Sequence, residues 1–192
     1  MVHTICMSGG AGPQPRPGSR LIRLVVLALC CAASILPAQE SRARIGLPGF
    51  KDVFPIEDVA SSFDLDAPVG KAYAAIKATF AELKVPLEGE DSVRGIVGNR
   101  KISARTNFAG YRLSRVLDCG TGGTGGQNAD SFQLYIALIA LLDPAGGSHT
   151  RVRVGFVAGA APVAGDTRNA VQCGSTGVLE ARLIELASKH LK

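Results

Sequence analysis

Apolar positions along the chain concentrate in one segment, residues 132–142, which reads FQLYIALIALL. Eleven residues are too few for a membrane-spanning helix, which needs about 20. Turn-forming residues follow at 143–147, and residues 150–158 then alternate in polarity. The pattern predicts a central strand that is apolar on both faces and pairs antiparallel with the next strand. A buried helix is the alternative, which periodicity alone does not exclude.

Two amphipathic helices are predicted on either side of this region. The first begins at Asp66, a good N-cap residue, carries Pro68 in its first turn and ends before Pro86. The last begins at residues 174–176, where hydroxyl side chains can cap it. Each helix has one apolar stripe, at Val69, Tyr73, Ile76, Phe80 and Leu83 in the first and at Leu179, Leu183, Leu186, Ala187 and Leu191 in the last. Such stripes are typical of helices that pack on a core.

Shorter elements are predicted between the two helices. Residues 93–104 read as a β-hairpin around Gly98 and Asn99, a pair that suits a two-residue turn. Residues 110–119 predict a short helix. Helices at both ends of antiparallel strands predict an α+β fold. We expect an antiparallel sheet of four to five strands, with the N-terminal and C-terminal helices packed on one face and the other face open.

Residues 1–38 have the pattern of a secretory signal peptide. Arg20 and Arg23 precede an apolar core at 24–36, and Ala38 offers a small residue at the cut. A membrane anchor that stays on the protein is the alternative, although the apolar core is short for one. We therefore expect export to the periplasm or the extracellular space, with cleavage after Ala38.

The chain is predicted to hold three parts: the signal peptide, a tether at 39–61 and a single α+β domain at 62–192. The tether has Pro48, Gly49 and Pro55 among scattered apolar residues, without a sustained period. Lipidation at Cys30 or Cys31 is an alternative fate of the leader, but neither cysteine follows a small residue.

The composition is that of a globular protein, with 46% hydrophobic and 19% charged residues. The formal net charge of +5 includes three arginines of the leader, and without them 18 basic and 16 acidic residues leave +2. Tryptophan is absent and aromatic residues make up 5% of the chain, so few aromatic side chains are available to stack on nucleic-acid bases. We therefore expect no nucleic acid as a partner.

Two cysteines remain after removal of the leader, Cys119 and Cys173. An even number of cysteines in an exported chain indicates a disulfide bond, and only one pairing is possible. The bond would close a loop of about 55 residues, which corresponds to roughly 4 kcal/mol in the chain-entropy model. A redox-active pair is the alternative, but it lacks the usual CxxC spacing.

The patterns that can carry chemistry lack their necessary partners. Residues 120–125 match GxGxxG, but this loop leads into a strand and carries no phosphate-binding lysine. His149 and His190 have no ligand partner at metal spacing, and the acidic residues at 88–91 read as a solvated turn. We expect no enzymatic activity, no cofactor and no metal.

Basic residues on the predicted strands form one further pattern. If Gly98 and Asn99 make the turn, strand alternation places five cations on the open face of the sheet. They are Arg94, Lys101, Arg105, Arg151 and Arg153. A basic face can bind anionic lipid, polysaccharide or an acidic protein, although charge that only keeps a face soluble is the alternative.

An apolar-striped helix followed by a hairpin that begins Asp-x-x-x-Gly occurs in residues 67–98, which read APVGKAYAAIKATFAELKVPLEGEDSVRGIVG. This stretch resembles the start of helix-grip domains of periplasmic proteins, such as those of the barrel-assembly lipoprotein C family. The resemblance implies a non-catalytic accessory domain of the cell envelope.

Two functions are therefore expected from the sequence. The first is an exported, non-enzymatic envelope domain that binds a protein partner or an anionic surface. The alternative is a carrier that holds a small apolar ligand between the sheet and the C-terminal helix.

Overall fold

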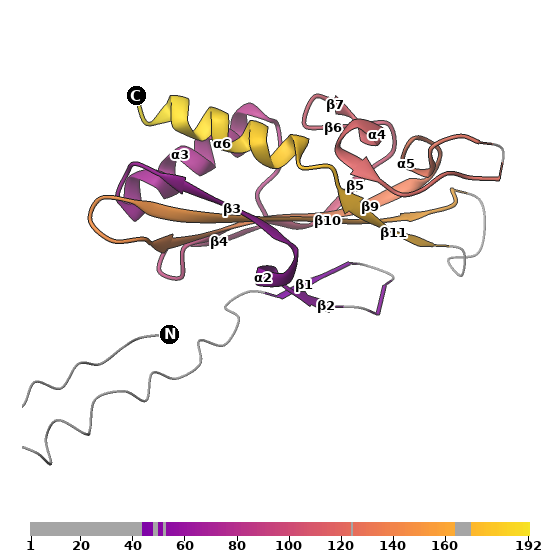
Figure 1. Ribbon diagram of the computed structural model, residues 1–192. Helices are drawn as coiled ribbons and strands as arrows, with labels where there is room; N and C mark the ends of the chain where they lie inside the picture. Colours follow the sequence, from indigo (N-terminus) through magenta and orange to yellow (C-terminus); the bar gives the residue numbers. More distant parts are fainter. Residues whose placement is uncertain (1–43, 48–49, 52, 124, 164–169) are drawn as a thin grey trace, which may run out of the picture. The chain divides into compact units, whose positions relative to one another are not determined.

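The computed structural model of the protein describes residues 44–47, 50–51, 53–123, 125–163 and 170–192 (Figure 1). These residues belong to one unit of the chain, Glu40–Lys192. The predicted signal peptide at 1–38 and the first residues of the predicted tether lie outside the described residues.

The predicted central strand is confirmed. β9 (Gln133–Pro144) pairs antiparallel with β10 (Thr150–Ala161) over the whole length of both strands. Even-numbered side chains of β9, such as Ile136 and Leu138, are buried on one face of the sheet. Odd-numbered side chains, such as Ile139 and Leu141, are buried on the other. β9 is therefore covered on both faces, as its continuous apolar sequence predicts.

The sheet around β9 has seven strands, so the predicted sheet of four to five strands is wrong. The order is β4-β5-β9-β10-β11-β8, and β3 pairs with β10 beside β11. The other strands are β3 (Ala60–Leu65), β4 (Gly89–Asp91), β5 (Ile96–Ala104), β8 (Leu117–Asp118) and β11 (Val171–Ser175). β4, β8 and β11 escape sequence analysis because so few residues give no readable alternation of polarity.

The turn between β4 and β5 lies at residues 92–95 and not at the predicted Gly98–Asn99 pair. Asp91 Oδ1 accepts a hydrogen bond from the Arg94 N–H at 2.9 Å, as in a turn started by an aspartate. Gly95 has a φ of 67°, a left-handed conformation that favours glycine. Residues 96–104 therefore form one strand where a hairpin was expected.

Gly98 and Asn99 have a different role inside β5. A Cβ at Gly98 would lie 2.3 Å from the carbonyl oxygen of Leu138, so the glycine permits close approach to β9. A bulge follows between Asn99 and Ile102, where the Asn99 Oδ1 accepts a hydrogen bond from the Lys101 N–H at 2.7 Å. Ile102 is buried in the core beyond the bulge.

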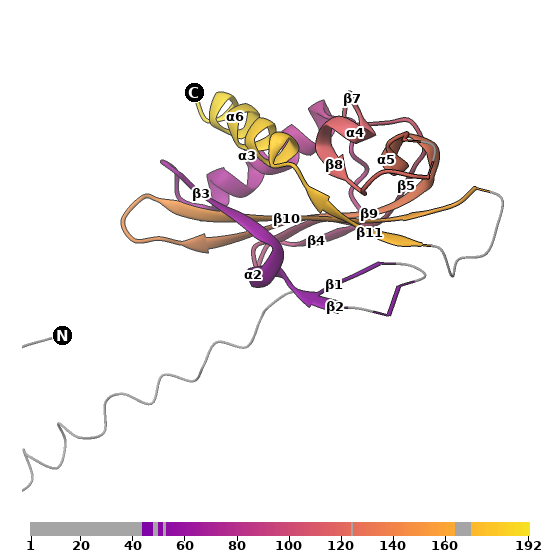
Figure 2. The ribbon, with the colours of Figure 1, turned by 45° about the vertical axis from the view of Figure 1, so that its right-hand side comes forward.

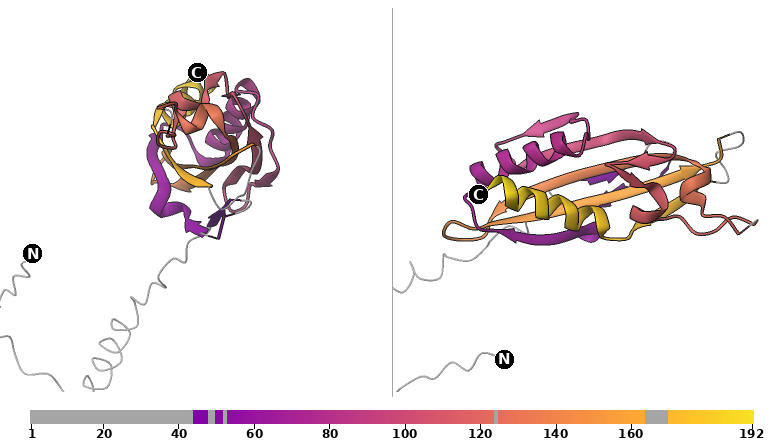
Figure 3. Two further views of the ribbon diagram at one scale, coloured as in Figure 1. Left: turned by 90° about the vertical axis from the view of Figure 1, so that its right-hand side faces the viewer. Right: turned by 90° about the horizontal axis from the view of Figure 1, so that it is seen from above.

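The helices α3 (Val69–Glu82) and α6 (Val178–His190) lie side by side over one face of the sheet (Figures 1 and 3). Phe80 and Leu183, from the two predicted stripes, have no exposed surface. The predicted helix at 110–119 is the single turn α4 (Leu113–Val116), next to α5 (Asn128–Ser131) and to the hairpin of β6 (Asn107–Phe108) and β7 (Tyr111–Arg112). Together these elements enclose the main hydrophobic core.

The opposite face of the sheet, here called the outer face, is covered as well (Figure 2). Its cover consists of β1 (Arg44–Gly46), β2 (Val53–Pro55) and α2 (Ile56–Val59). We call the described residues of 44–59 the N-terminal strap. Ile45 and Ile56 have no exposed surface and pack with Ile139 and Leu141 in a second core. The predicted open face is wrong, because apolar residues that were assigned to a tether cover it.

Two glycines of β10 make room for the N-terminal strap. A Cβ at Gly155 would lie 2.7 Å from Ile45 Cδ1, and one at Gly159 would lie 2.1 Å from Phe50 Cε2. Both distances are shorter than any normal contact, so larger side chains there would displace the strap.

The predicted disulfide bond joins Cys119 to Cys173. Cys119 follows β8 directly, and Cys173 lies in the middle of β11. These two strands share only two paired positions, so the covalent bond reinforces a short edge of the sheet.

Candidate functional site

The five predicted cations do not form one continuous basic face. Arg94 lies in the β4–β5 turn, Lys101 at the bulge of β5 and Arg105 just after β5. Arg151 and Arg153 lie on β10, which is separated from β5 by β9. The register that would have aligned all five depends on the Gly98–Asn99 turn, which the structure replaces with a bulge.

Four of the five cations contact carboxylates. The pairs are Arg94–Asp91 at 2.8 Å, Lys101–Glu88 at 2.7 Å, Arg151–Asp64 at 3.1 Å, and Arg153 with Glu57 at 3.1 Å and with Asp143. Arg105 makes no ion pair with any residue that the structure describes. Neighbouring acids therefore largely neutralise the positive potential around the five predicted cations.

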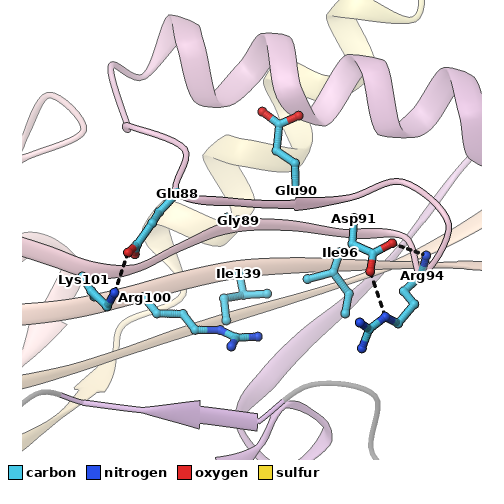
Figure 4. A pocket seen from close by; sticks show the side chains of 10 residues that line it. Glu88, Gly89, Glu90, Asp91, Arg94, Ile96, Arg100, Lys101 and Ile139 are labelled. Atoms are coloured by element: carbon cyan, nitrogen blue, oxygen red, sulfur yellow. Dashed lines mark hydrogen bonds and ion pairs between the residues drawn. The ribbon is translucent and has the colours of Figure 1, made fainter.

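A hollow of about 440 Å³ opens on the outer face where β4 and β5 form the edge of the sheet (Figure 4). We call it the edge hollow. Its apolar floor consists of Ile96 and Ile139, and its charged rim includes Arg94, Arg100 and Lys101. Two of the predicted cations thus lie at one concave site, whereas the other three do not line it.

Arg100 is the residue of the edge hollow that sequence analysis missed. Figure 4 shows its side chain on the same side of the strands as Ile96 and Ile139. It is exposed and makes no ion pair with a described residue. The predicted turn at Gly98–Asn99 left Arg100 out of the five cations assigned to one face. No sequence signal marks the bulge, which lets Arg100 and Lys101 line the same hollow.

The acids of the edge hollow are already engaged by other groups. Hydrogen bonds from the Arg94 backbone N–H, and then from its side chain, lower the pKa of the Asp91 carboxyl. Glu90 points away from the hollow toward α3, where its Oε2 lies 2.5 Å from Lys77 Nζ (Figure 4). This hydrogen bond raises the pKa of Lys77. Arg100 is therefore the cation of the hollow without a carboxylate of its own.

The other patterns singled out in the sequence form local structure. In the glycine-rich loop the Gly122 N–H donates to the Gly126 carbonyl at 2.8 Å, and the helix that follows has only four residues. His149 contacts Asp66 at 2.7 Å and His190 contacts Glu82 at 3.0 Å, each as a single exposed pair. Within the described residues no three His, Cys, Asp or Glu side chains are grouped to hold a metal ion. Nor does any described helix have the length and apolar character to cross a membrane.

Comparison with known proteins gives no family for this chain. No protein-family model matches it, and no curated protein matches it. The resemblance to helix-grip domains therefore stays a prediction from the sequence.

Proposed function

We propose that this chain is an exported, non-enzymatic domain of the cell envelope that binds a protein partner through an acidic group at the edge hollow. One observation carries the proposal. Arg100 presents an exposed guanidinium above an apolar floor, at the edge of the sheet, and has no ion-pair partner among the described residues. A guanidinium binds a carboxylate through two parallel hydrogen bonds, and the floor favours an apolar neighbour of that carboxylate.

The free edge of β5 supports a polypeptide as the occupant. β4 pairs with β5 only from Gly89↔Gly98 to Asp91↔Ile96. Among the described residues, no strand pairs with Ile102–Ala104 on the side away from β9. An exposed strand edge is a template for a further strand, and pairing there would bring the added segment past Arg100 and Lys101.

A flat anionic membrane is the less favoured partner. Binding to such a surface needs several unpaired cations on one face, but four of the five predicted ones contact carboxylates. A single carboxylate in a hollow needs only one free guanidinium. The protein partner is therefore the better match to the site.

The proposal is tested with Arg100→Gln and the matched control Arg105→Gln, which removes another exposed cation that lies outside the hollow and makes no ion pair within the described part of the chain. The probe is a fluorescent peptide in which valine and glutamate alternate, titrated at low salt. We expect Arg100→Gln to weaken binding about tenfold or more, the usual effect of losing a charge-assisted hydrogen bond, and Arg105→Gln to change it little.

Two results would contradict the proposal. Equal weakening by both variants, with binding to phosphatidylglycerol vesicles of the same strength, would indicate a diffuse charge effect at a membrane. No measurable binding of the peptide would remove the edge hollow as a partner site. Mass analysis of the native protein tests export separately, because cleavage after Ala38 leaves Gln39 as the first residue.

A further inference from the structure

The second strand edge of the sheet, along β10, is interrupted. β3 pairs with β10 from Thr150 to Gly155, and β11 pairs with the same edge from Ala158 to Ala160. Phe156 and Val157 lie between the two strands, with no strand partner on this side among the described residues. Because the backbone N–H and C=O groups of successive residues point to opposite edges of a strand, one of these two residues directs its N–H and C=O into the gap.

A cleft of about 730 Å³ lies at this gap, within the size range of small-molecule sites. The N-terminal strap forms one wall with Leu47, Phe54 and Val59. Residues of β11, the two residues before α6 and Glu180 in the first turn of that helix form the other wall. We call it the gap cleft. It differs from the edge hollow in position, since β9 and β10 separate it from β4 and β5.

The charges that line the gap cleft have one sign. Asp58 of α2 and Glu180 of α6 are its ionisable residues, and no lysine, arginine or histidine is among its described lining. An apolar cleft with two carboxylates and no cation disfavours an anionic occupant and favours a positively charged one.

Glu180 is a buried carboxylate with one oxygen that lacks a hydrogen-bond donor among the described residues. It is only 1% exposed, although it carries a carboxylate. One oxygen, Oε1, accepts a hydrogen bond from the Ser175 hydroxyl at 2.6 Å. The other, Oε2, is buried and has no hydrogen-bond partner among the residues that the structure describes. A buried carboxylate oxygen without a donor is unfavourable, so a ligand donor at this oxygen would be strongly stabilised.

From these observations we infer that the gap cleft binds a small amphiphile that carries a primary ammonium group. The ammonium donates to the Glu180 carboxylate, and the apolar chain lies between the N-terminal strap and Val157. Oε2 has almost no accessible surface, so the ligand reaches it through a rotation of the Ser175 and Glu180 side chains. Ser175 is the exposed last residue of β11, which leaves room for this rotation. The site is independent of the edge hollow.

The Ser175–Glu180 hydrogen bond also joins the end of β11 to the first turn of α6, since Glu180 is the third residue of that helix. A purely structural role and a ligand-binding role predict different results. If the role is only structural, replacing Glu180 changes stability but has no selective effect on cationic ligands.

The test uses n-octylammonium, octan-1-ol, octanoate and methylammonium as probes, titrated into the oxidised protein and followed by the methyl resonances of Val59 and Val157. We expect octylammonium to bind at least tenfold more tightly than the alcohol, the octanoate or the short amine, because only octylammonium has both the donor charge and the chain. This comparison needs no variant, so it does not depend on whether a substituted protein folds.

Glu180→Gln keeps the shape of the side chain and removes its charge, and Glu185→Gln removes a charge from the exposed side of the same helix. We expect Glu180→Gln to weaken octylammonium binding about tenfold without changing that of octanol, and Glu185→Gln to leave both unchanged. Equal affinities for octylammonium and octanol in the native protein would overturn the inference in favour of a purely apolar carrier. Absence of shifts at both valines with every probe would overturn the site itself.

Discussion

The N-terminal strap packs closely on β10 at Gly155, so Gly155→Ala is a direct test of how the outer face is covered. The added methyl would lie 2.7 Å from Ile45 Cδ1 and 3.0 Å from Ile56 Cγ1, and both isoleucines have no exposed surface. Overpacking of this kind costs about 1–3 kcal/mol, and the reduced freedom of the unfolded chain offsets about 0.4–1 kcal/mol. We expect the free energy of unfolding to fall by about 1–2 kcal/mol.

The contact with Ile45 can be isolated by a double-mutant cycle. Ile45→Val removes Cδ1, the atom nearest to the new methyl, and alone should cost about 0.5–1.5 kcal/mol. In the double variant the alanine methyl fills the space of the lost Cδ1. The loss of stability in the double variant should therefore be about 1 kcal/mol smaller than the sum of the losses in the two single variants.

Urea unfolding of the oxidised protein measures the four stabilities, and Gly70→Ala provides a control of opposite sign. A Cβ at Gly70 has no atom within 4 Å, so alanine there should stabilise α3 by about 0.5–1 kcal/mol. Additive effects of Gly155→Ala and Ile45→Val, or a neutral Gly155→Ala, would refute the packing of the strap on β10.

Three further predictions concern the helix layer, the disulfide bond and the surface of α6. Phe80→Ala should lower stability by about 3–5 kcal/mol, measured by urea unfolding, because it empties a fully buried position under α3. Reduction of the Cys119–Cys173 bond should cost about 2–5 kcal/mol, and free alkylation of both thiols in the unreduced folded protein would contradict it. Hydrogen bonds from Lys189 and then from Arg182 lower the pKa of Glu185 to about 2, below its usual 4.5. The contribution of the ionised Glu185 to folding stability is therefore complete above about pH 4.5 and is lost as the pH falls toward 2. Carboxyl NMR titration should show that midpoint, and Lys189→Gln should raise it.

The sequence predicts the centre of the fold well because its signals there are local. The hairpin of β9 and β10 follows from an apolar run, a turn and an alternating strand. The stripes of α3 and α6 follow from helical spacing, and the cysteine pairing follows from the even number of cysteines left after the predicted leader. The apolar side chains on both faces of β9 conflicted with the predicted open face, because they need a cover on the outer face, which residues such as Ile45 and Ile56 provide.

The edges of the sheet and both candidate sites depend on non-local contacts. Gly98 looks like a turn residue, but it serves a close approach to β9, and the bulge that follows decides where Arg100 lies. The gap cleft exists because β3 and β11, far apart in sequence, divide one edge of β10 between them. No local pattern at Glu180 marks it as more than a helix residue.

The pairing of β3 with β10 has a consequence for the time at which the protein can fold. Leu65 pairs with Thr150, and Ile45 packs beside Gly155. The N-terminal strap and β3 therefore cannot reach their final contacts until the ribosome has synthesised β10. Such high contact order slows folding, since a long loop must close before the contacts form. The nascent chain therefore stays open while most of it is synthesised. If the chain is exported as we propose, this delay would keep it extended while it crosses a translocation channel. Cys119 and Cys173, which link β8 to β11, would then meet an oxidising compartment before the sheet forms around them.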